Sequence, residues 1–258
     1  MHTSVRIGHI GLSFHAASAA VVQRIVERHG YRVESVAAPH EDMFKHYGAG
    51  EVDFLVSAWL PASHGGYLAP YAEQTRTLGV LYQPYCIWGV PDYVPAEAVA
   101  SIDDLKRPDV AAHMSLLIQG INPGAGISRF SRDIIEQYGL DQVGYHFANG
   151  TQAQCFERFE QAVERREWIV VPLWHPQFLH YRYAIRALHE PRGLLGGQDD
   201  ATLIVREETA AHLAPALLDE LSQLSLGNAT ISELDYWICR EGLSPLEAAD
   251  RWLAQSFT

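Results

Sequence analysis

Apolar and polar positions alternate in a strand, helix, strand order along the first sixty residues. The segment VRIGHIGL (5–12) has the pattern of a strand, and residues 15–30 place valines and isoleucines at helical spacing. Residues 31–38 predict a second strand and residues 41–50 a short helix. The next run, VDFLVSAW (52–59), is apolar almost throughout, which predicts a parallel strand buried on both faces.

A second series with the same order follows the aromatic stretch 77–95. Residues 114–138 predict a strand, a glycine-rich turn and a helix, and residues 151–168 predict another helix with Thr151 as its cap. WIVVPLW (168–174) then predicts a buried strand that again ends in tryptophan. Farther on, residues 201–208 predict a strand, and SPLE (244–247) has the pattern of a helix capping box. The pattern predicts an α/β protein with two similar halves.

Composition narrows the classes of partner. The chain has 258 residues, of which 48% are hydrophobic and 19% charged, and this length suffices for two lobes of about 100–150 residues each. The formal net charge of −12 argues against nucleic acid and anionic membranes as partners. Three cysteines without CxxC spacing exclude a fully paired disulfide framework and give no zinc signature. An acidic surface is compatible with a small cationic or zwitterionic ligand.

Several signals that would change this interpretation are missing from the sequence. It contains no GxSxG, HExxH or Walker motif, so we expect a protein that is not an enzyme and uses no cofactor or metal. No stretch approaches the roughly 20 apolar residues that cross a bilayer. The start, MHTSVRIGHIGLSF, lacks the pattern of a signal peptide, so the chain is either cytoplasmic as written or has lost a leader.

The stretch SAWLPASH (57–64) places an indole and an imidazole directly after a buried strand. Trp59 and Trp174 stand at corresponding points of the two halves, where α/β sheets bind ligands. Indole faces attract quaternary ammonium groups by about 0.5–2 kcal/mol. The alternative is that Trp59 only covers the core and His64 lies on the surface.

The stretch GINPGAGIS (120–128) is the second candidate. Its glycines leave the backbone amides of Gly126 and Ile127 at a helix start, where an anion is favoured. The stretch lacks the GK[ST] ending of a P-loop, so a small carboxylate fits better than a nucleotide, and the alternative is a tight turn. An aromatic cage together with an amide anion site describes a zwitterion with a bulky onium head, which is a betaine.

Four segments together resemble the glycine betaine/choline-binding proteins of ABC transporters. They are SFHAASAAVVQRIVERHGYRVE, SAWLPASHGGYLAPY, GINPGAGI and VVPLWHPQFLHYRYAIRALHEP, and the resemblance covers roughly residues 5–225. It implies a type II periplasmic-binding-protein fold, with two α/β lobes that close by a hinge around a ligand in the interlobe cleft. We accordingly predict lobe I from residues 1–90 and 201–258, lobe II from 91–200, and hinge crossings near 88–95 and 196–203.

The resemblance also implies roles for individual residues. The expected cage walls are Trp59, Trp174 and Tyr93, and the expected carboxylate partners are His64 and the amides of Gly126 and Ile127. Many relatives have a further cage tryptophan where this chain has Leu12. Residues that could contribute in its place, or line the cleft, are Phe14, His15, Trp88 and His175.

The leading hypothesis is a periplasmic substrate-binding protein that delivers a betaine-like osmolyte to the permease and ATPase subunits of an ABC transporter. Glycine betaine, proline betaine, dimethylsulfoniopropionate and carnitine all stay open as ligands. Choline ranks lower because it lacks a carboxylate. The alternative is an intracellular ligand-binding sensor with the same fold.

Overall fold

The computed structural model describes residues 4–256, and contacts divide the chain into two compact units. Unit 1 comprises Met1–Pro84, Pro176–Tyr181 and Asp199–Thr258, and unit 2 comprises Tyr85–His175 and Arg182–Gln198. The predicted lobes differ from these units at 85–90, 176–181 and 199–200. The predicted hinge crossings stay a prediction.

Unit 1 is built on a five-stranded sheet in the order β2-β1-β3-β10-β4. The strands are β1 (Ser4–Ile10), β2 (Arg32–Ala38), β3 (Phe54–Leu60), β4 (Thr75–Tyr82) and β10 (Asp200–Arg206). β3 pairs in parallel with β1 and antiparallel with β10. The prediction of a parallel strand is confirmed for the β1 side and wrong for the β10 side, where a strand from the last quarter of the chain pairs in the opposite direction. β3 is buried from Phe54 to Trp59, as its apolar run predicts.

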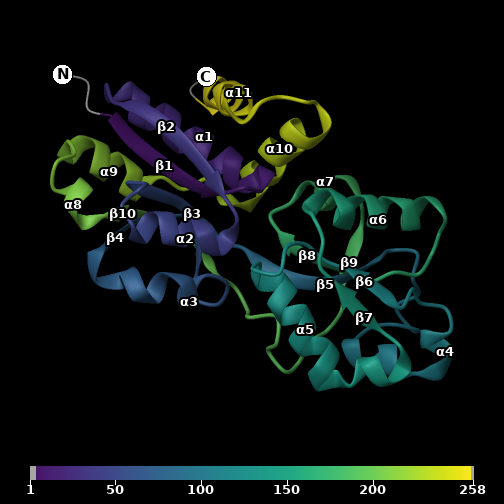
Figure 1. Cartoon of the computed structure of the whole chain (residues 1–258). Helices are drawn as coiled ribbons and strands as arrows, with labels where there is room; N and C mark the ends of the chain where they lie inside the picture. Colours follow the sequence, from purple (N-terminus) through teal and green to yellow (C-terminus); the bar gives the residue numbers. More distant parts are fainter. Residues whose placement is uncertain (1–3, 257–258) are drawn as a thin grey trace. The chain divides into compact units, whose positions relative to one another are not determined.

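Helices cover this sheet, as Figure 1 shows. They are α1 (Ser13–Arg28), α2 (His40–Gly48), α3 (Gly65–Leu68), η1 (Ala69–Gln74), α8 (Glu207–Ala210), α9 (Pro215–Gln223), α10 (Gly227–Arg240) and α11 (Pro245–Ser256). Apart from these, the first four residues of the short helix α7 (Phe178–Arg182) belong to unit 1. α1 packs against β1, α10 and α11. The predicted capping box of α11 is confirmed, because the Ser244 hydroxyl accepts from the Glu247 N–H and the Glu247 carboxylate accepts from the Ser244 N–H.

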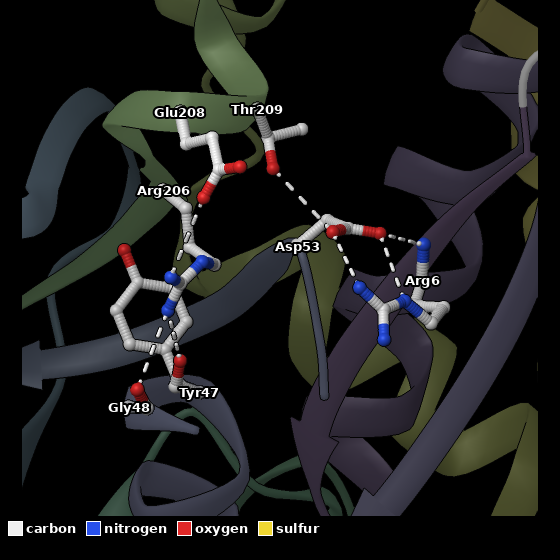
Figure 2. Close-up of polar contacts among 7 residues, drawn as sticks. All are labelled: Arg6, Tyr47, Gly48, Asp53, Arg206, Glu208 and Thr209. Carbon is white, nitrogen blue, oxygen red and sulfur yellow. Dashed lines mark hydrogen bonds and ion pairs between the residues drawn. The ribbon is translucent and has the colours of Figure 1, made fainter. Parts of the chain in front are cut away.

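Charged side chains join the elements at the end of the sheet where β1 and β3 begin (Figure 2). Asp53 accepts hydrogen bonds from the Arg6 backbone N–H (2.7 Å), the Arg6 guanidinium (2.9 Å) and the Thr209 hydroxyl (3.4 Å). Arg206, at the end of β10, donates to the Tyr47 carbonyl (2.7 Å) in the last turn of α2, where helix carbonyls lack intrahelical partners. Arg6, Asp53, Arg206 and Thr209 line a cavity of about 430 Å³. Their partners fasten β1, β3, β10 and α2 together, which accounts for the cluster as part of the fold.

Unit 2 has a three-stranded antiparallel sheet and a parallel strand pair. The sheet, in the order β8-β5-β9, contains β5 (Tyr85–Pro91), β8 (Val171–His175) and β9 (Ile185–Ala187), and the pair consists of β6 (Leu117–Gln119) and β7 (His146–Ala148). The helices are η2 (Ile102–Lys106), α4 (Pro108–Ala111), α5 (Gly126–Tyr138), η3 (Leu140–Val143) and α6 (Gln152–Glu164). The predicted cap is confirmed, since Thr151 accepts from the Gln154 N–H. The predicted strand at 168–174 begins only at Val171, where pairing with Gly89 begins.

Candidate functional site

Trp59 lies near the carboxyl end of β3, with 6% of its surface exposed. Its indole N–H donates to the Tyr82 hydroxyl (3.0 Å) and, more weakly, to the Ser57 hydroxyl (3.3 Å). The centroid of the Phe14 ring lies 5.4 Å from the centroid of the indole. The polar edge of the indole is thus bonded within unit 1, and its carbon faces are what the ring can offer to a ligand.

His64 is bound to the same strand end by two hydrogen bonds. The Trp59 backbone N–H donates to His64 Nδ1 (2.9 Å), and the His64 N–H donates to the Trp59 carbonyl (2.8 Å). A neutral imidazole that accepts at Nδ1 carries its proton on Nε2, so His64 is a hydrogen-bond donor at that atom. His64 is buried, so the alternative of a surface histidine is wrong.

Two aromatic residues at the start of α1 lie beside Trp59. Leu12 is the N-cap residue of α1 and is buried, as are Phe14 and His15. His15 Nδ1 lies 2.9 Å from the Ser57 hydroxyl, and its ring centroid is 5.5 Å from that of Trp59. Burial, together with the neighbouring histidines, holds the pKa of His15 well below its usual value, so this imidazole is uncharged. Phe14 and His15 therefore place aromatic rings beside Trp59.

Gly126 and Ile127 are the first residues of α5 in unit 2, and both are buried. The amides of the first helical turn have no intrahelical acceptor and carry the positive end of the helix dipole. The N-cap, Ala125, makes no side-chain capping bond. Arg129 donates to the Gly124 carbonyl (2.5 Å) and Arg132 to the Pro123 carbonyl (3.1 Å), so carbonyls of the preceding turn are bound by cations of the same helix. The local arrangement suits an anion.

Trp174 is the second-last residue of β8 and is also buried, with 1% of its surface exposed. It lies opposite Cys86 of β5, and the Phe156 ring centroid is 5.9 Å from that of its indole. The next residue, His175, stacks on Tyr85 at 5.3 Å. Burial lowers the pKa of His175, which favours a neutral ring.

Two other predicted aromatic residues serve the packing of unit 2. Trp88 is fully buried in β5, and its indole N–H donates to the Ser131 hydroxyl (2.8 Å) of α5. The Tyr93 hydroxyl donates to the carbonyls of Ala162 (3.1 Å) and Glu167 (2.7 Å), and the Arg166 guanidinium lies 4.8 Å from its ring centroid. These contacts join Tyr93 to the end of α6, and its role in a cage stays a prediction.

Sequence reasoning missed Ser57 and Tyr82, which contact the indole of Trp59 directly. One signal was present: Ser57 is the single hydroxyl residue in the apolar run VDFLVSAW. Tyr82 gave no such signal, because its place beside Trp59 depends on β10 lying between β3 and β4. Within residues 4–256 no cluster of histidine, cysteine, aspartate and glutamate is arranged to hold a metal ion.

The comparison with known families covers nearly the whole chain. The family model for the substrate-binding domain of ABC-type glycine betaine transport systems matches residues 3–255. The chain belongs to this family. Its members are transport substrate-binding proteins, which accounts for the missing catalytic motifs.

Solved structures confirm a type II periplasmic-binding-protein fold. Lactococcal OpuAC, in its closed-liganded conformation complexed with glycine betaine, is 23% identical with a TM-score of 0.86, over 98% of this chain and 96% of that one. The glycine betaine/L-proline-binding protein ProX from Borrelia burgdorferi is 24% identical with a TM-score of 0.87, over 98% and 93%. An ABC-transporter choline-binding protein in complex with choline is 20% identical with a TM-score of 0.84, over 99% and 90%.

A curated relative matches over a shorter region. The glycine betaine/carnitine transport binding protein GbuC from Listeria monocytogenes serotype 1/2a (strain 10403S) is 25% identical over 150 residues, which are 58% of this chain and 49% of the relative. The match therefore spans about half the length of that protein. In the part of the chain that the structure describes, no helix has both the length and the apolar character to cross a membrane.

Proposed function

We propose that this protein binds a betaine-like zwitterion, which has an alkylated ammonium or sulfonium head and a carboxylate, and presents it to an ABC transporter. The proposal rests on the hydrogen bonding of the Trp59 indole. Its one N–H is bonded to hydroxyl groups of its own unit, so the ring offers carbon faces to a ligand. A cation without N–H groups is the head group that such a surface favours.

The carboxylate end of the ligand is matched by donors in both units. Unit 2 supplies the amides of Gly126 and Ile127 at the start of a helix of 13 residues. Unit 1 supplies His64, whose Nδ1 accepts a backbone N–H, so its Nε2 donates. We propose that Trp174 provides a second aromatic face, and that both sets of groups bind one ligand molecule.

Leu12 bears on which zwitterion is bound. A leucine side chain lacks the quadrupole that attracts cations, so this wall contributes packing alone. Glycine betaine, proline betaine, dimethylsulfoniopropionate and carnitine all combine an onium head with a carboxylate. Choline lacks the acceptor that His64 and the α5 amides would meet, and it ranks below these four.

Membership of the transport family supports the proposed partners and place of action. A substrate-binding domain of an ABC-type system works with permease and ATPase subunits, and we propose such partners here. We also propose that the protein acts outside the cytoplasmic membrane.

Titration calorimetry against the four zwitterions and choline tests the proposal. Trp59→Ala and Trp174→Ala should each weaken binding by about 1–3 kcal/mol, from lost cation–π attraction and buried aromatic area. Trp252→Ala, on α11 of unit 1, is the matched control and should leave affinity unchanged. Wild-type protein that binds none of the quaternary ammonium or sulfonium zwitterions would refute the proposal.

A further inference from the structure

The backbone of Ser57 has an unusual conformation in the middle of a buried strand. Its φ is +65°, in the left-handed region where residues other than glycine are uncommon. The register explains why: Leu55 pairs with Ile204 and Ala58 with Thr202, so β3 has one more residue than β10 across this interval. An extra residue forms a β-bulge, which redirects a side chain.

The redirected hydroxyl of Ser57 lies at the centre of a small polar network. It is 2.5 Å from the Tyr82 hydroxyl and 2.9 Å from His15 Nδ1, and it lies 3.3 Å from the indole nitrogen of Trp59. Tyr82 completes the network with its 3.0 Å bond from the same indole nitrogen. All four side chains are buried. The φ of residue 57 would favour glycine, but the residue is serine, and its hydroxyl is needed for the hydrogen bonds of this network.

The network fixes the indole whichever way its protons point. An indole nitrogen only donates, whereas each hydroxyl both donates and accepts. The Trp59 N–H donates to the hydroxyl oxygens of Tyr82 and Ser57 in every arrangement of the hydroxyl protons. Burial raises the pKa of Tyr82 to about 12 and lowers that of His15, so the network also carries no charge that would repel a cation.

We propose that Ser57, Tyr82 and His15 are positioning residues that hold the Trp59 ring with its polar edge inside unit 1 and its carbon face toward the onium head. This inference rests on the proposed function and adds a physical cause for the preference of the site among ammonium head groups. The carbon face attracts a fully alkylated cation, and it has no acceptor atom that could replace the hydrogen bonds an ammonium N–H makes with water. Trimethylated head groups are therefore preferred over partly methylated ones.

Two variants separate positioning from ordinary packing. Tyr82→Phe deletes one hydroxyl and keeps the ring, and Tyr47→Phe is its control, because Tyr47 is an equally buried tyrosine of unit 1 whose hydroxyl donates to Thr75 (3.1 Å). Ser57→Gly deletes the other hydroxyl and relieves the backbone, since glycine adopts positive φ freely. A residue that served the fold alone would give binding losses that follow stability losses in both variants.

The probes are trimethylglycine and dimethylglycine, which share the carboxylate and differ in one methyl group. Tyr82→Phe and Ser57→Gly should each weaken trimethylglycine binding about tenfold, and dimethylglycine binding less, while Tyr47→Phe changes neither. The indole N–H resonance of Trp59, assigned by its loss in Trp59→Phe, should move in the ¹H–¹⁵N spectrum of both positioning variants. Ser57→Gly should melt close to the wild-type temperature.

The outcomes distinguish the two proposals. Unchanged affinity, an unmoved indole resonance, or equal losses for both probes that follow the melting temperature would overturn the positioning role and leave the proposed function intact. A wild-type protein that does not bind trimethylglycine or the other onium zwitterions would overturn both. Should Tyr82→Phe fail to fold, Ser57→Gly decides the question by the same three measurements.

Discussion

Trp59 of unit 1 and Trp174 of unit 2 stand in similar sequence settings, SAWLP and PLWHP, yet they are held by different means. Trp59 is fixed by hydrogen bonds of its indole N–H to Tyr82 and Ser57. Trp174 has the Phe156 ring 5.9 Å away and lies opposite Cys86 in the strand pair β5–β8. The indole of Trp59 thus depends on directed polar bonds, and the indole of Trp174 packs beside the ring of Phe156.

The chain that follows each indole is also anchored differently. After Trp59 the loop returns through His64, which exchanges two hydrogen bonds with the Trp59 backbone. After Trp174 the chain enters unit 1 at Pro176, and the Phe178 N–H donates to the buried carboxyl group of Asp235 (2.9 Å). These differences predict different responses to substitution in the two units.

The largest expected effect comes from removing the ring beside each indole. Phe14→Ala and Phe156→Ala should each lower the free energy of unfolding by about 3–5 kcal/mol. Ligand affinity should fall more for Phe156→Ala, because Trp174 then loses packing, whereas hydrogen bonds still hold Trp59 in Phe14→Ala. Urea unfolding and calorimetry measure the two quantities, and equal affinity losses would contradict the difference in anchoring.

The next effect concerns Asp235 and pH. Burial raises its pKa from 3.8 to about 6. A folded-state pKa above the unfolded value gives stability that is complete below the unfolded pKa and is lost as pH rises through about 6. The free energy of unfolding of the wild type minus that of Asp235→Asn should therefore decline between pH 4 and pH 7. Urea unfolding at several pH values measures it, and a difference that rises with pH would refute the raised pKa.

A smaller effect is expected at Leu12, for which the resemblance predicts the position of a cage wall. Leu12→Trp should tighten binding of trimethylammonium zwitterions by about 1 kcal/mol through an added cation–π contact. Leu12→Met, which keeps the volume without a ring, is the control and should leave affinity unchanged. Calorimetry on both variants, with melting temperatures to monitor overpacking, tests this, and equal affinities would show that position 12 does not face the head group.

The smallest effect on binding is expected at Tyr93. Because its hydroxyl is bonded to Ala162 and Glu167, Tyr93→Phe should cost about 1–2 kcal/mol of stability and change affinity less than twofold. Tyr93→Leu removes the ring as well. If Tyr93→Leu also leaves affinity unchanged, Tyr93 has no part in a cage.

Local chemistry accounts for what the sequence predicted well. The caps at Thr151 and Ser244 depend on neighbours three residues away, so a short window contains the whole interaction. The burial of β3 follows from its own apolar run. Both indoles could be placed near strand ends because a proline shortly after each of them marks where the strand stops.

Long-range pairing accounts for what the sequence could not give. The antiparallel neighbour of β3 is formed by residues 200–206, and no feature of the β3 sequence predicts this pairing. The bulge at Ser57 exists only in that register, and Tyr82 contacts Trp59 only because β10 separates their strands. Trp88 was considered for the cage, yet its indole N–H bonds to Ser131 in the interior of unit 2, a partner that no spacing rule links to it.

The central position of β10 also has a consequence for the order of synthesis. β3 and β4 are made early, and β3 can pair with β1, but the edges of β3 and β4 that pair with β10 stay unpaired until Asp200–Arg206 has left the ribosome. Every residue of unit 2 precedes that strand. The half of the protein that contains the first residues is thus completed last, and its two unpaired strand edges are open to wrong partners during that delay.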